Sequence, residues 1–267
     1  MFTWFSRKKK QPAHHRAKRG SDDFVSLSSH ELRSPLSVIK WYTEILLDED
    51  AGKLTDDQRK YLTLIESSNQ RAIDLIRALL NVSRLDLGTF SISPEEISLD
   101  DTISEAVSSM KCEADKKHVS FSFMASPGSH MMALDKNITS LILKSLLHNA
   151  VFFSKEGGVV DIKLSHIRAG STFLGVTILD DSIIMTVADT GAGIPSLDQS
   201  KIATKMFKAS NSGDSPGSGL SLYIVKTIME KVQGRFGFVS EEGKGSTFFV
   251  AIPSKGMEKK VGRTTLE

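Results

Sequence analysis

The sequence predicts two structural parts, an all-α helical hairpin followed by an α/β sandwich with a mixed sheet and helices on one face. The first part is indicated by apolar residues that recur at alternating spacings of four and three between residues 22 and 86, the pattern of a helix with one buried seam. The second part is indicated by a change of period after residue 88, where strand-like and helical segments mix, as in a sheet covered by helices.

The hairpin is expected to consist of one helix from Asp22 to about Asp48 and a second from Thr55, which can cap it, to about Asp86. Each helix would be about 40–48 Å long at the usual rise per residue. One hairpin of that length cannot bury both seams well, so we expect a homodimer that forms a four-helix bundle. A lone hairpin packed on the second part is the alternative. The seam consists of Leu32, Leu36, Ile39, Thr43, Leu46, Tyr61, Ile65, Ser68, Ala72, Leu75, Leu79 and Val82.

The second part begins where Gly88 and Pro94 end the helical pattern. Strands are expected at residues 97–99, 119–124, 159–167, 172–179, 183–187, 235–239 and 247–252, and helices at 99–116, 137–153 and 220–232. The stretch 165–181 is longer than a simple connection needs and is interpreted as an extra hairpin. The expected organisation is therefore a basic disordered tail at 1–20, a helical domain at 21–87, an α/β domain at 88–254 and a disordered tail at 255–267.

The composition, 40% hydrophobic and 25% charged, is that of a soluble globular protein. One cysteine, Cys112, excludes an intramolecular disulfide and a thiolate metal cluster, so a reducing, cytoplasmic compartment is expected. No apolar run approaches the roughly 18 residues of a membrane span. Residues 1–19 carry seven Lys or Arg and no acid, which suits a solvated arm, contact with an anionic membrane surface or the remnant of a membrane anchor. No nucleic-acid partner is expected.

A histidine and a carboxylate are adjacent near the start of the first predicted helix, in the run His30-Glu31-Leu32-Arg33-Ser34-Pro35-Leu36. Neutral imidazole is a nucleophile at physiological pH, and an adjacent carboxylate can fix its tautomer by accepting the other ring proton. Pro35 should kink the helix just after His30. One such pair is more often part of a solvated helix surface, so its meaning depends on the rest of the chain.

Four short stretches further along suit nucleotide binding. Asn149 lies near the end of an apolar helix, and its amide oxygen suits Mg²⁺ beside phosphates. The run Asp189-Thr190-Gly191-Ala192-Gly193 follows a buried strand; its carboxylate can accept from an exocyclic amine, and its glycines let the backbone approach a flat base. The run Gly217-Ser218-Gly219 opens a helix whose N-terminus favours phosphate, and residues 243–248 can close the base pocket. Each stretch alone is commonly a turn or a cap; their order after the hairpin is more specific.

In this order of motifs the chain resembles the transmitter core of a sensor histidine kinase from a two-component system, over residues 21–253. Residues 30–36 resemble the H box, 146–150 the N box, 189–193 the G1 box, 205–208 the F box and 217–222 the G2 box. The resemblance implies a dimerisation and histidine phosphotransfer domain, followed by an ATP-binding domain of the Bergerat fold that gyrase-class ATPases share.

The resemblance also implies roles for individual residues. His30 would be the phosphoacceptor beside Glu31, and Ser34 would stand where Thr or Asn more often assists dephosphorylation of the partner. ATP and Mg²⁺ are the implied cofactors, with Asn149 as the metal ligand. The other implied nucleotide contacts are Asp189 with the adenine amine, Gly191 and Gly193 in the base pocket, Gly217, Gly219 and Leu220 with phosphate oxygens, Thr247 beside the adenine, and Lys205 or Lys208 as the cation of a lid.

The leading hypothesis is a homodimeric ATP:protein-histidine phosphotransferase that passes the phosphoryl group from His30 to an aspartate of a separate response regulator receiver domain, with phosphatase activity left open. The chain departs from the family pattern at Ser145, Phe152 and Ser221, where Asn, Lys and Gly are usual. Losing a ligand oxygen and a cation should weaken phosphate binding. A second hypothesis is therefore a degenerate scaffold that binds a response regulator or heterodimerises, and a third is a gyrase-like ATPase without histidine chemistry.

Overall fold

The computed structural model describes residues 31, 33–128, 130–213, 217–262 and 264–266, and the chain forms two compact units, residues 1–76 and 77–267. The division falls inside the long helix α2 (Asp56–Leu87) and not at its end, where the sequence predicts the domain boundary. The reason is that Val82 and Leu85, in the last turns of α2, are buried in the core of the second unit. The predicted N-terminal tail and His30 lie outside the described residues.

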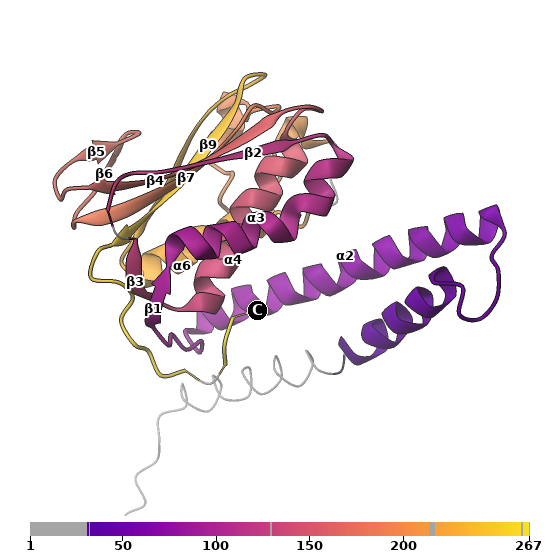
Figure 1. The fold of residues 1–267 in the computed structure, drawn as a ribbon. Coiled ribbons are helices and arrows are strands. Elements are labelled where there is room, and N and C mark those ends of the chain that lie inside the picture. The colour runs from indigo at the N-terminus through magenta and orange to yellow at the C-terminus, as the bar shows by residue number, and fades with distance from the viewer. Residues whose placement is uncertain (1–30, 32, 129, 214–216, 263, 267) are drawn as a thin grey trace, which may run out of the picture. The chain divides into compact units, whose positions relative to one another are not determined.

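The first unit contains the first of the two helices that the heptad pattern predicts and the larger part of the second (Figure 1). Residues 33–47 are helical, and α2 follows after a turn. Thr55 caps α2 as predicted: the Gln58 N–H donates to Thr55 Oγ1 at 3.3 Å, and the Thr55 N–H donates to Gln58 Oε1 at 2.9 Å, which is a capping box. Between the helices, Asn69 Nδ2 donates to the Leu36 carbonyl oxygen at 2.9 Å. This bond helps to set how the two helices pair.

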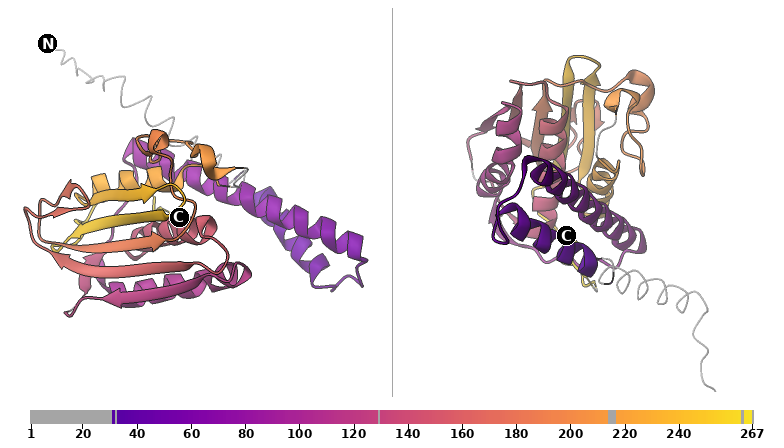
Figure 2. Two further views of the ribbon diagram at one scale, coloured as in Figure 1. Left: turned by 90° about the horizontal axis from the view of Figure 1, so that it is seen from above. Right: turned by 90° about the vertical axis from the view of Figure 1, so that its right-hand side faces the viewer.

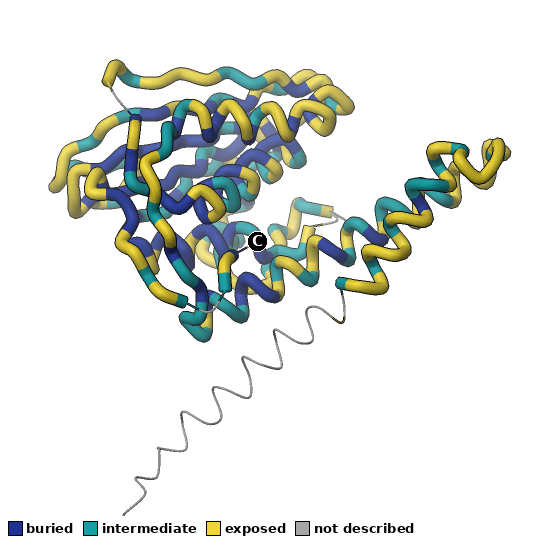
Figure 3. Tube along the Cα trace, turned by 60° about the horizontal axis from the view of Figure 1, so that its bottom comes forward, coloured by how far each residue is buried: buried dark blue, intermediate teal, exposed yellow. Residues whose placement is uncertain are grey.

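Much of the predicted apolar seam is exposed in the single chain, as the surface colouring of the hairpin also shows (Figure 3). Thr43 is buried, with 4% of its surface exposed, but six larger seam residues are 37–61% exposed. These are Ile39, Leu46, Tyr61, Ile65, Leu75 and Leu79. An open apolar surface of this kind commonly marks an interaction site. The homodimeric bundle remains a prediction, which this exposed seam supports.

The second unit is built on one mixed sheet, as predicted. The order across the sheet is β2 (Ser120–Ala125), β4 (Val159–Ile167), β7 (Ser182–Asp189), β9 (Gly245–Pro253) and β8 (Arg235–Glu241). Strands β2 and β4 are parallel, and the other neighbouring pairs in this sheet are antiparallel. Two strands, β1 (Glu95–Ser98) and β3 (Met131–Leu134), pair separately with each other, and β3 is absent from the predicted strands.

Three helices cover one face of the five-stranded sheet (Figure 1, and the left view of Figure 2). They are α3 (Leu99–Lys116), α4 (Lys136–Phe153) and α6 (Ser221–Lys231), and the short α5 (Ser196–Gln199) and the 3₁₀ turn η1 (Ser210–Ser212) precede α6. The N-terminus of α4 is capped by Asp135, whose Oδ1 accepts from the Asn137 and Ile138 N–H groups at 3.0 and 3.1 Å. This layering confirms the predicted sheet with helices on one face.

Alternation along the central strands separates two apolar clusters. Val187 of β7 and Phe248 of β9 belong to the large core under the helices, whereas Ile184 and Phe249 belong to a small cluster on the opposite face. The predicted extra hairpin is present as β5 (Thr172–Phe173) and β6 (Val176–Thr177), and Phe173 contacts the Phe249 ring edge-on at 5.1 Å. The hairpin therefore covers part of the sheet face that the helices leave open.

The sequence predicts a disordered C-terminal segment, and this prediction is wrong for the described residues. The Ile92 N–H donates to the Lys260 carbonyl oxygen at 2.8 Å, and the Ser91 N–H donates to the Thr264 carbonyl oxygen at 2.8 Å. Leu266 is only 3% exposed. The segment therefore packs as a strap on the linker that follows α2.

The physical reason for this error is that the strap has almost no periodic pattern. Two apolar side chains, Met257 and Leu266, are buried in the core, and the charged residues between them give the segment its polar composition. Lys260 is not simply solvated, because its Nζ lies 3.7 Å from the centre of the Phe90 ring, a cation–π contact. Burial in an apolar neighbourhood lowers the pKa of Lys260 from its usual 10.5.

Deleting residues 260–267 should lower the free energy of unfolding by about 2–4 kcal/mol, since burial of Leu266 and the strap's backbone hydrogen bonds are lost. Thermal unfolding followed by circular dichroism would measure the effect. The matched control is Val261→Ser. Because Val261 is 89% exposed, this substitution should change the free energy of unfolding by less than about 0.5 kcal/mol. An unchanged midpoint on deletion would show that the strap does not stabilise the domain.

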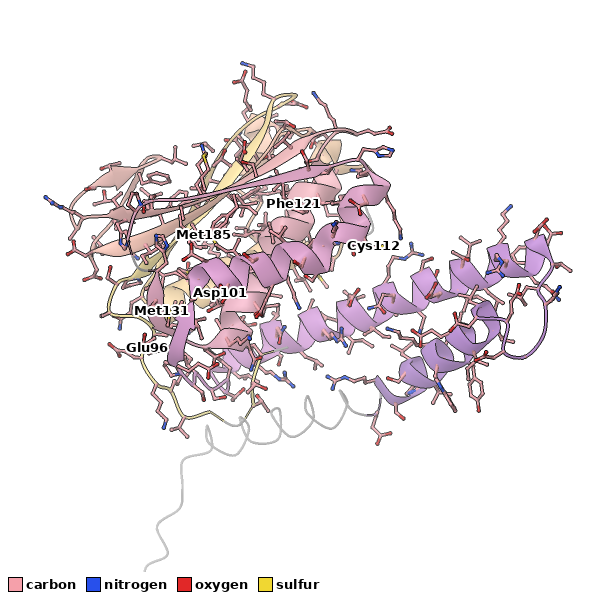
Figure 4. All side chains as sticks on the ribbon, in the orientation of Figure 1. Glu96, Asp101, Cys112, Phe121, Met131 and Met185 are labelled. Carbon is pink, nitrogen blue, oxygen red and sulfur yellow. The ribbon has the colours of Figure 1, made fainter. Side chains whose placement is uncertain are left out.

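Three further features concern the described residues alone. None of the described helices has both the length and the apolar character needed to cross a membrane. Cys112 is exposed on α3 (Figure 4). Among the described residues, no group of three or more His, Cys, Asp or Glu side chains is arranged to hold a metal ion.

Candidate nucleotide-binding site

A pocket lies at the end of β7, between α4, α6 and the segment that precedes α6. It encloses about 760 Å³ of space that no atom fills, and part of this space is open solvent at its mouth. The lining residues are Asn149, Phe153, Asp189, Gly193, Ile194, Ile202, Phe207, Lys208, Ala209, Asn211, Ser212, Gly217, Gly219, Ser221, Leu222, Ser246 and Phe248. Most of the wall is apolar, with polar groups at a few places, as in typical ligand sites.

Asp189 is the buried carboxylate of this pocket, with 8% of its surface exposed. Its Oδ1 accepts from the Gly191 N–H at 2.9 Å and from the Ser246 N–H at 3.3 Å. Burial raises the pKa of Asp189 above its usual 3.8, and the two backbone donors partly offset this rise. Because these two donors fix one carboxylate oxygen, the other can accept from a polar ligand group in the pocket.

The glycines after Asp189 are required by close backbone contacts. A Cβ at Gly191 would lie 2.1 Å from the Phe153 carbonyl oxygen, and a Cβ at Gly193 would lie 2.0 Å from the Glu241 carbonyl oxygen. Gly193 also has a positive φ of 63°, a region that glycine adopts without steric cost. The loop therefore packs directly against α4 on one side and the β8–β9 turn on the other.

The N-terminus of α6 forms another side of the pocket. Gly217, Gly219 and Ser221 line it there, and unpaired N–H groups at a helix start attract anions. Asn149 reaches the pocket from α4 and Lys208 from the segment before α6. Amide, ammonium and backbone N–H groups together form an environment that suits phosphate groups.

The segment that follows α5, called the lid below (residues 200–213), is fixed at several points. Asn211 Nδ2 donates to the Gly193 carbonyl oxygen at 3.1 Å. The Ser210 N–H and Oγ donate to Asp198 Oδ2 at 2.6 and 2.7 Å. A Cβ at Gly219 would lie 2.6 Å from the Phe207 carbonyl oxygen, so the lid backbone touches the loop at the start of α6.

The structure brings six of the predicted nucleotide-binding residues to this pocket, and four others do not line it. Lys205, the alternative cation of the lid, contacts Asp86 Oδ2 at 2.6 Å instead. Leu220 is buried in the core, and Gly191 lies behind the pocket wall, where its N–H holds Asp189. The prediction of Thr247 is wrong by one position along β9. Its neighbours Ser246 and Phe248 line the pocket, and because side chains alternate between the two faces of a strand, Thr247 lies on the other face. The six that line it are Asn149, Asp189, Gly193, Lys208, Gly217 and Gly219.

Sequence reasoning missed part of the apolar wall of the pocket. Phe153 and Ile194 line it, yet each also fits a purely structural pattern, that of a helix end or a turn. The stretch 243–248, which the sequence predicts to close the base pocket, contributes Ser246 and Phe248 to the lining.

The positions that depart from the family pattern differ in their consequences. Ser221 lines the pocket, whereas Ser145 and Phe152 do not. The Phe152 ring stacks on His148 at 6.2 Å, and Lys117 Nζ lies 5.5 Å from its centre. Lys117 Nζ also donates to the Phe152 carbonyl oxygen and, at 2.9 Å, to that of Ser154. A neutral ring beside Lys117 avoids the repulsion that the usual lysine would meet there.

The predicted phosphoacceptor motif lies only partly within the described residues. Glu31 and Ser34 are helical and exposed, whereas His30 lies outside the described part of the chain. Pro35 lies within continuous helix. The position of the predicted kink, just after His30, likewise includes residues outside the described part of the chain.

Two sequence families match this chain. The model of the "His Kinase A (phospho-acceptor) domain" matches residues 21–88, and that of the "Histidine kinase-, DNA gyrase B-, and HSP90-like ATPase" matches residues 135–256. The first covers the helical hairpin with His30, and the second covers the pocket around Asp189. The chain belongs to the sensor histidine kinases, as a transmitter core.

Named relatives agree with this assignment. The transmitter core is 28% identical over 250 residues to the cell-division control histidine kinase PdhS of Brucella anthropi, and equally so to that of Brucella suis. These matches cover 89% of this chain but only 23% of each relative. The chain therefore spans about a quarter of the length of these relatives.

Solved structures share the fold of the transmitter core. Full-length ShkA, crystallised in complex with AMPPNP, has a TM-score of 0.70 at 24% identity, covering 91% of this chain and 48% of that one. The histidine kinase AdeS of Acinetobacter baumannii has a TM-score of 0.56 at 16% identity, covering 84% and 98% of the two chains. At these identities the likeness concerns the fold.

Proposed function

We propose that this transmitter core uses ATP to phosphorylate His30 and passes the phosphoryl group to an aspartate in the receiver domain of a response regulator. The observation that carries the proposal is the pocket, in which a buried carboxylate with one oxygen fixed faces apolar walls and a helix N-terminus. A purine, which has an exocyclic amine on a flat apolar ring, and a triphosphate, which is anionic, fit this combination.

The pocket residues then have separate roles. Asp189 accepts from the adenine amine, and Phe153 and Phe248 contact the base. The N–H groups at the start of α6 and the Lys208 ammonium stabilise negative charge on the phosphates. Phosphoryl transfer depends mainly on such alignment and charge neutralisation.

The described residues also fit a magnesium ion. Mg²⁺ is usually held by one or two protein groups together with phosphate oxygens and waters. Asn149 offers one amide oxygen on the pocket wall, so it would be the protein ligand in such a site. The ion would neutralise charge on the phosphates.

On the helical hairpin, His30 is the nucleophile in this proposal. The Glu31 carboxylate accepts a hydrogen bond from the N–H of the other ring nitrogen. This bond favours the tautomer in which the attacking nitrogen is unprotonated. The Ser34 hydroxyl, one turn later, supports a phosphatase reaction on the partner, in which it would orient a water. We place these reactions in the cytoplasm, where ATP is available and Cys112 would stay reduced.

Two partners follow from the proposal. A second copy of the chain would cover the exposed seam of the hairpin, of which Tyr61 and Ile65 are 61% and 48% exposed, and give a homodimeric four-helix bundle. A response regulator would supply the receiving aspartate.

Incubation with γ-labelled ATP and Mg²⁺ should produce a phosphoprotein whose label is lost in acid and stable in base. His30→Gln should abolish the label entirely, because glutamine has no nucleophilic nitrogen, while Mg-ATP binding measured by calorimetry stays unchanged. Ser37→Ala on the same exposed helix is the control and should leave labelling intact. Label that persists in His30→Gln would reject His30 as the acceptor.

A degenerate scaffold is the second candidate, and one observation favours it. The lysine that is usual in the family is replaced by Phe152, whose ring faces His148 and Lys117. If the chain fails to bind Mg-ATP at millimolar concentration but still captures a response regulator, the scaffold is the better description. Phosphate release without any phosphoprotein would instead indicate a plain ATPase.

A further inference from the structure

Three side chains from distant parts of the sequence meet beside the lid. Asp86 lies in the last turn of α2, Lys205 in the lid and Tyr223 in the first turn of α6. Lys205 Nζ is 2.6 Å from Asp86 Oδ2, and the Tyr223 hydroxyl donates to Asp86 Oδ1 at 2.8 Å. The Lys205 ammonium also lies 5.1 Å from the centre of the Tyr223 ring. Both oxygens of Asp86 are therefore engaged, and each pair of the three side chains is in contact.

This contact is continuous with the pocket wall. Lys205 is followed by Met206, which has a φ of 58°, an uncommon conformation for a residue with a side chain. Phe207 and Lys208 come next and line the pocket, and the Phe207 carbonyl lies against Gly219. Whatever fixes Lys205 thus also limits where Phe207 and Lys208 can lie.

The end of α2 is a firm point of attachment. Leu85 is completely buried in the core beside Asp86. In the same helical turn, the Arg84 side chain donates from Nη1 to the Thr265 carbonyl oxygen at 2.8 Å. Because the end of α2 is held in place by the core and the strap, Asp86 has a fixed position. Its bond to Lys205 can therefore restrict the movement of the lid.

The charges of this group are mutually stabilised. Burial alone would raise the pKa of Asp86, but hydrogen bonds from Lys205 and Tyr223 and the positive charges of Lys205 and Lys231 bring it below 3.8. The hydrogen bond to Asp86 raises the pKa of Lys205 in turn. Both groups therefore remain charged over the whole physiological range.

We propose that Asp86 is a positioning residue for nucleotide binding: with Tyr223 it holds Lys205 and so keeps the Phe207–Lys208 part of the lid in place to receive the triphosphate. This inference rests on the proposed ATP binding at the same site. A lid that is already ordered loses less conformational freedom when the ligand binds. The contact should therefore act mainly by slowing nucleotide dissociation.

An exposed ion pair by itself contributes little, so the test needs a pair for comparison. Lys136 Nζ and Glu105 Oε2 lie 3.4 Å apart, both exposed, on α4 and α3, and neither residue lines the pocket. Glu105→Gln removes the same kind of charge as Asp86→Asn would, but away from the lid. It controls for general effects of charge on binding and stability.

The dissociation constant and dissociation rate of Mg-ATP should be measured with a fluorescent ATP analogue by competition and stopped flow. Asp86→Asn should raise the dissociation constant about three- to tenfold, chiefly through faster dissociation, whereas Glu105→Gln should leave it within about twofold. Tyr223→Phe should have a smaller effect in the same direction. The exchange Asp86→Lys with Lys205→Asp should recover most of the affinity that either single change loses, and circular dichroism should show that all variants fold.

Equal dissociation constants for Asp86→Asn and Glu105→Gln, or no recovery in the charge exchange, would overturn the inference. The outcome for the proposed function is separate. If the unaltered chain binds Mg-ATP but never labels His30, the phosphotransfer fails while the role of Asp86 can still be measured. If the unaltered chain binds no Mg-ATP at all, both are rejected.

Discussion

Asp189→Asn should raise the dissociation constant of Mg-ATP by about 100-fold or more and remove phosphorylation of His30. The asparagine oxygen can still accept from the Gly191 and Ser246 N–H groups, which now bond to Asp189 Oδ1. Its NH₂ group would then face the adenine amine, so two donors would oppose each other in a buried site. A lost hydrogen bond to a charged acceptor together with an unsatisfied buried donor costs about 3–5 kcal/mol.

The same substitution should make the nucleotide-free protein more stable at neutral pH. Since burial raises the pKa of Asp189 above 3.8, the folded protein holds this proton more tightly than the unfolded chain does. Between 3.8 and the raised pKa the folded state binds more protons, so the free energy of unfolding falls as pH rises, and it stays lower above that range. The amide that replaces the carboxyl group does not titrate, so the gain in stability over the native protein should be largest at neutral pH and smallest below pH 3.8.

Calorimetry for binding, and urea unfolding at several pH values without nucleotide, would measure the two effects. The matched control is Asp161→Asn, which removes a carboxylate from the neighbouring strand β4, where Asp161 pairs with Ala188. It should preserve nucleotide binding. Native-like affinity in Asp189→Asn would contradict the assigned base contact, and a pH-independent stability difference would contradict the burial argument.

The fold was predictable from the sequence because its main elements depend on local signals. Thr55 and Gln58 form a reciprocal cap, and the apolar helix α4 starts at its Asp135 cap. Such signals involve residues a few positions apart, so they can be recognised in the sequence without knowledge of the tertiary structure. The four-residue strand β3 and the C-terminal strap depend on partners far along the chain, and no pattern within them predicts these pairings.

The candidate site was predictable where a residue type is chemically special. Asp189, Asn149 and the glycines differ from anything a plain core needs, whereas Phe153 and Ile194 do not, and so this part of the apolar wall was missed. Thr247 shows a further limit: a pattern of small residues identifies the right turn, but a shift of one residue along a strand changes the face that a side chain occupies. Asp86 shows another limit of prediction from sequence, because its partners Lys205 and Tyr223 lie more than a hundred residues away along the chain.

Gly193→Ala should destabilise the ATP-binding unit by about 2–5 kcal/mol, the combined cost of a positive φ for alanine and of forcing backbone segments apart. The new methyl group would lie 2.0 Å from the Glu241 carbonyl oxygen and 2.9 Å from the Glu242 Cα, and backbone atoms cannot rotate away as a side chain can. Nucleotide binding should be lost with it, because the loop that starts at Asp189 would have to move.

Gly217→Ala is the matched change on the other side of the same pocket. No atom of the described residues lies within 4 Å of the position that its Cβ would take, and its φ lies outside the positive region, so the folded protein should keep its thermal midpoint. Any loss of Mg-ATP affinity in this variant would therefore report crowding of the phosphates and not damage to the fold. Equal destabilisation by the two substitutions would show that the close backbone packing at Gly193 is not what requires glycine there.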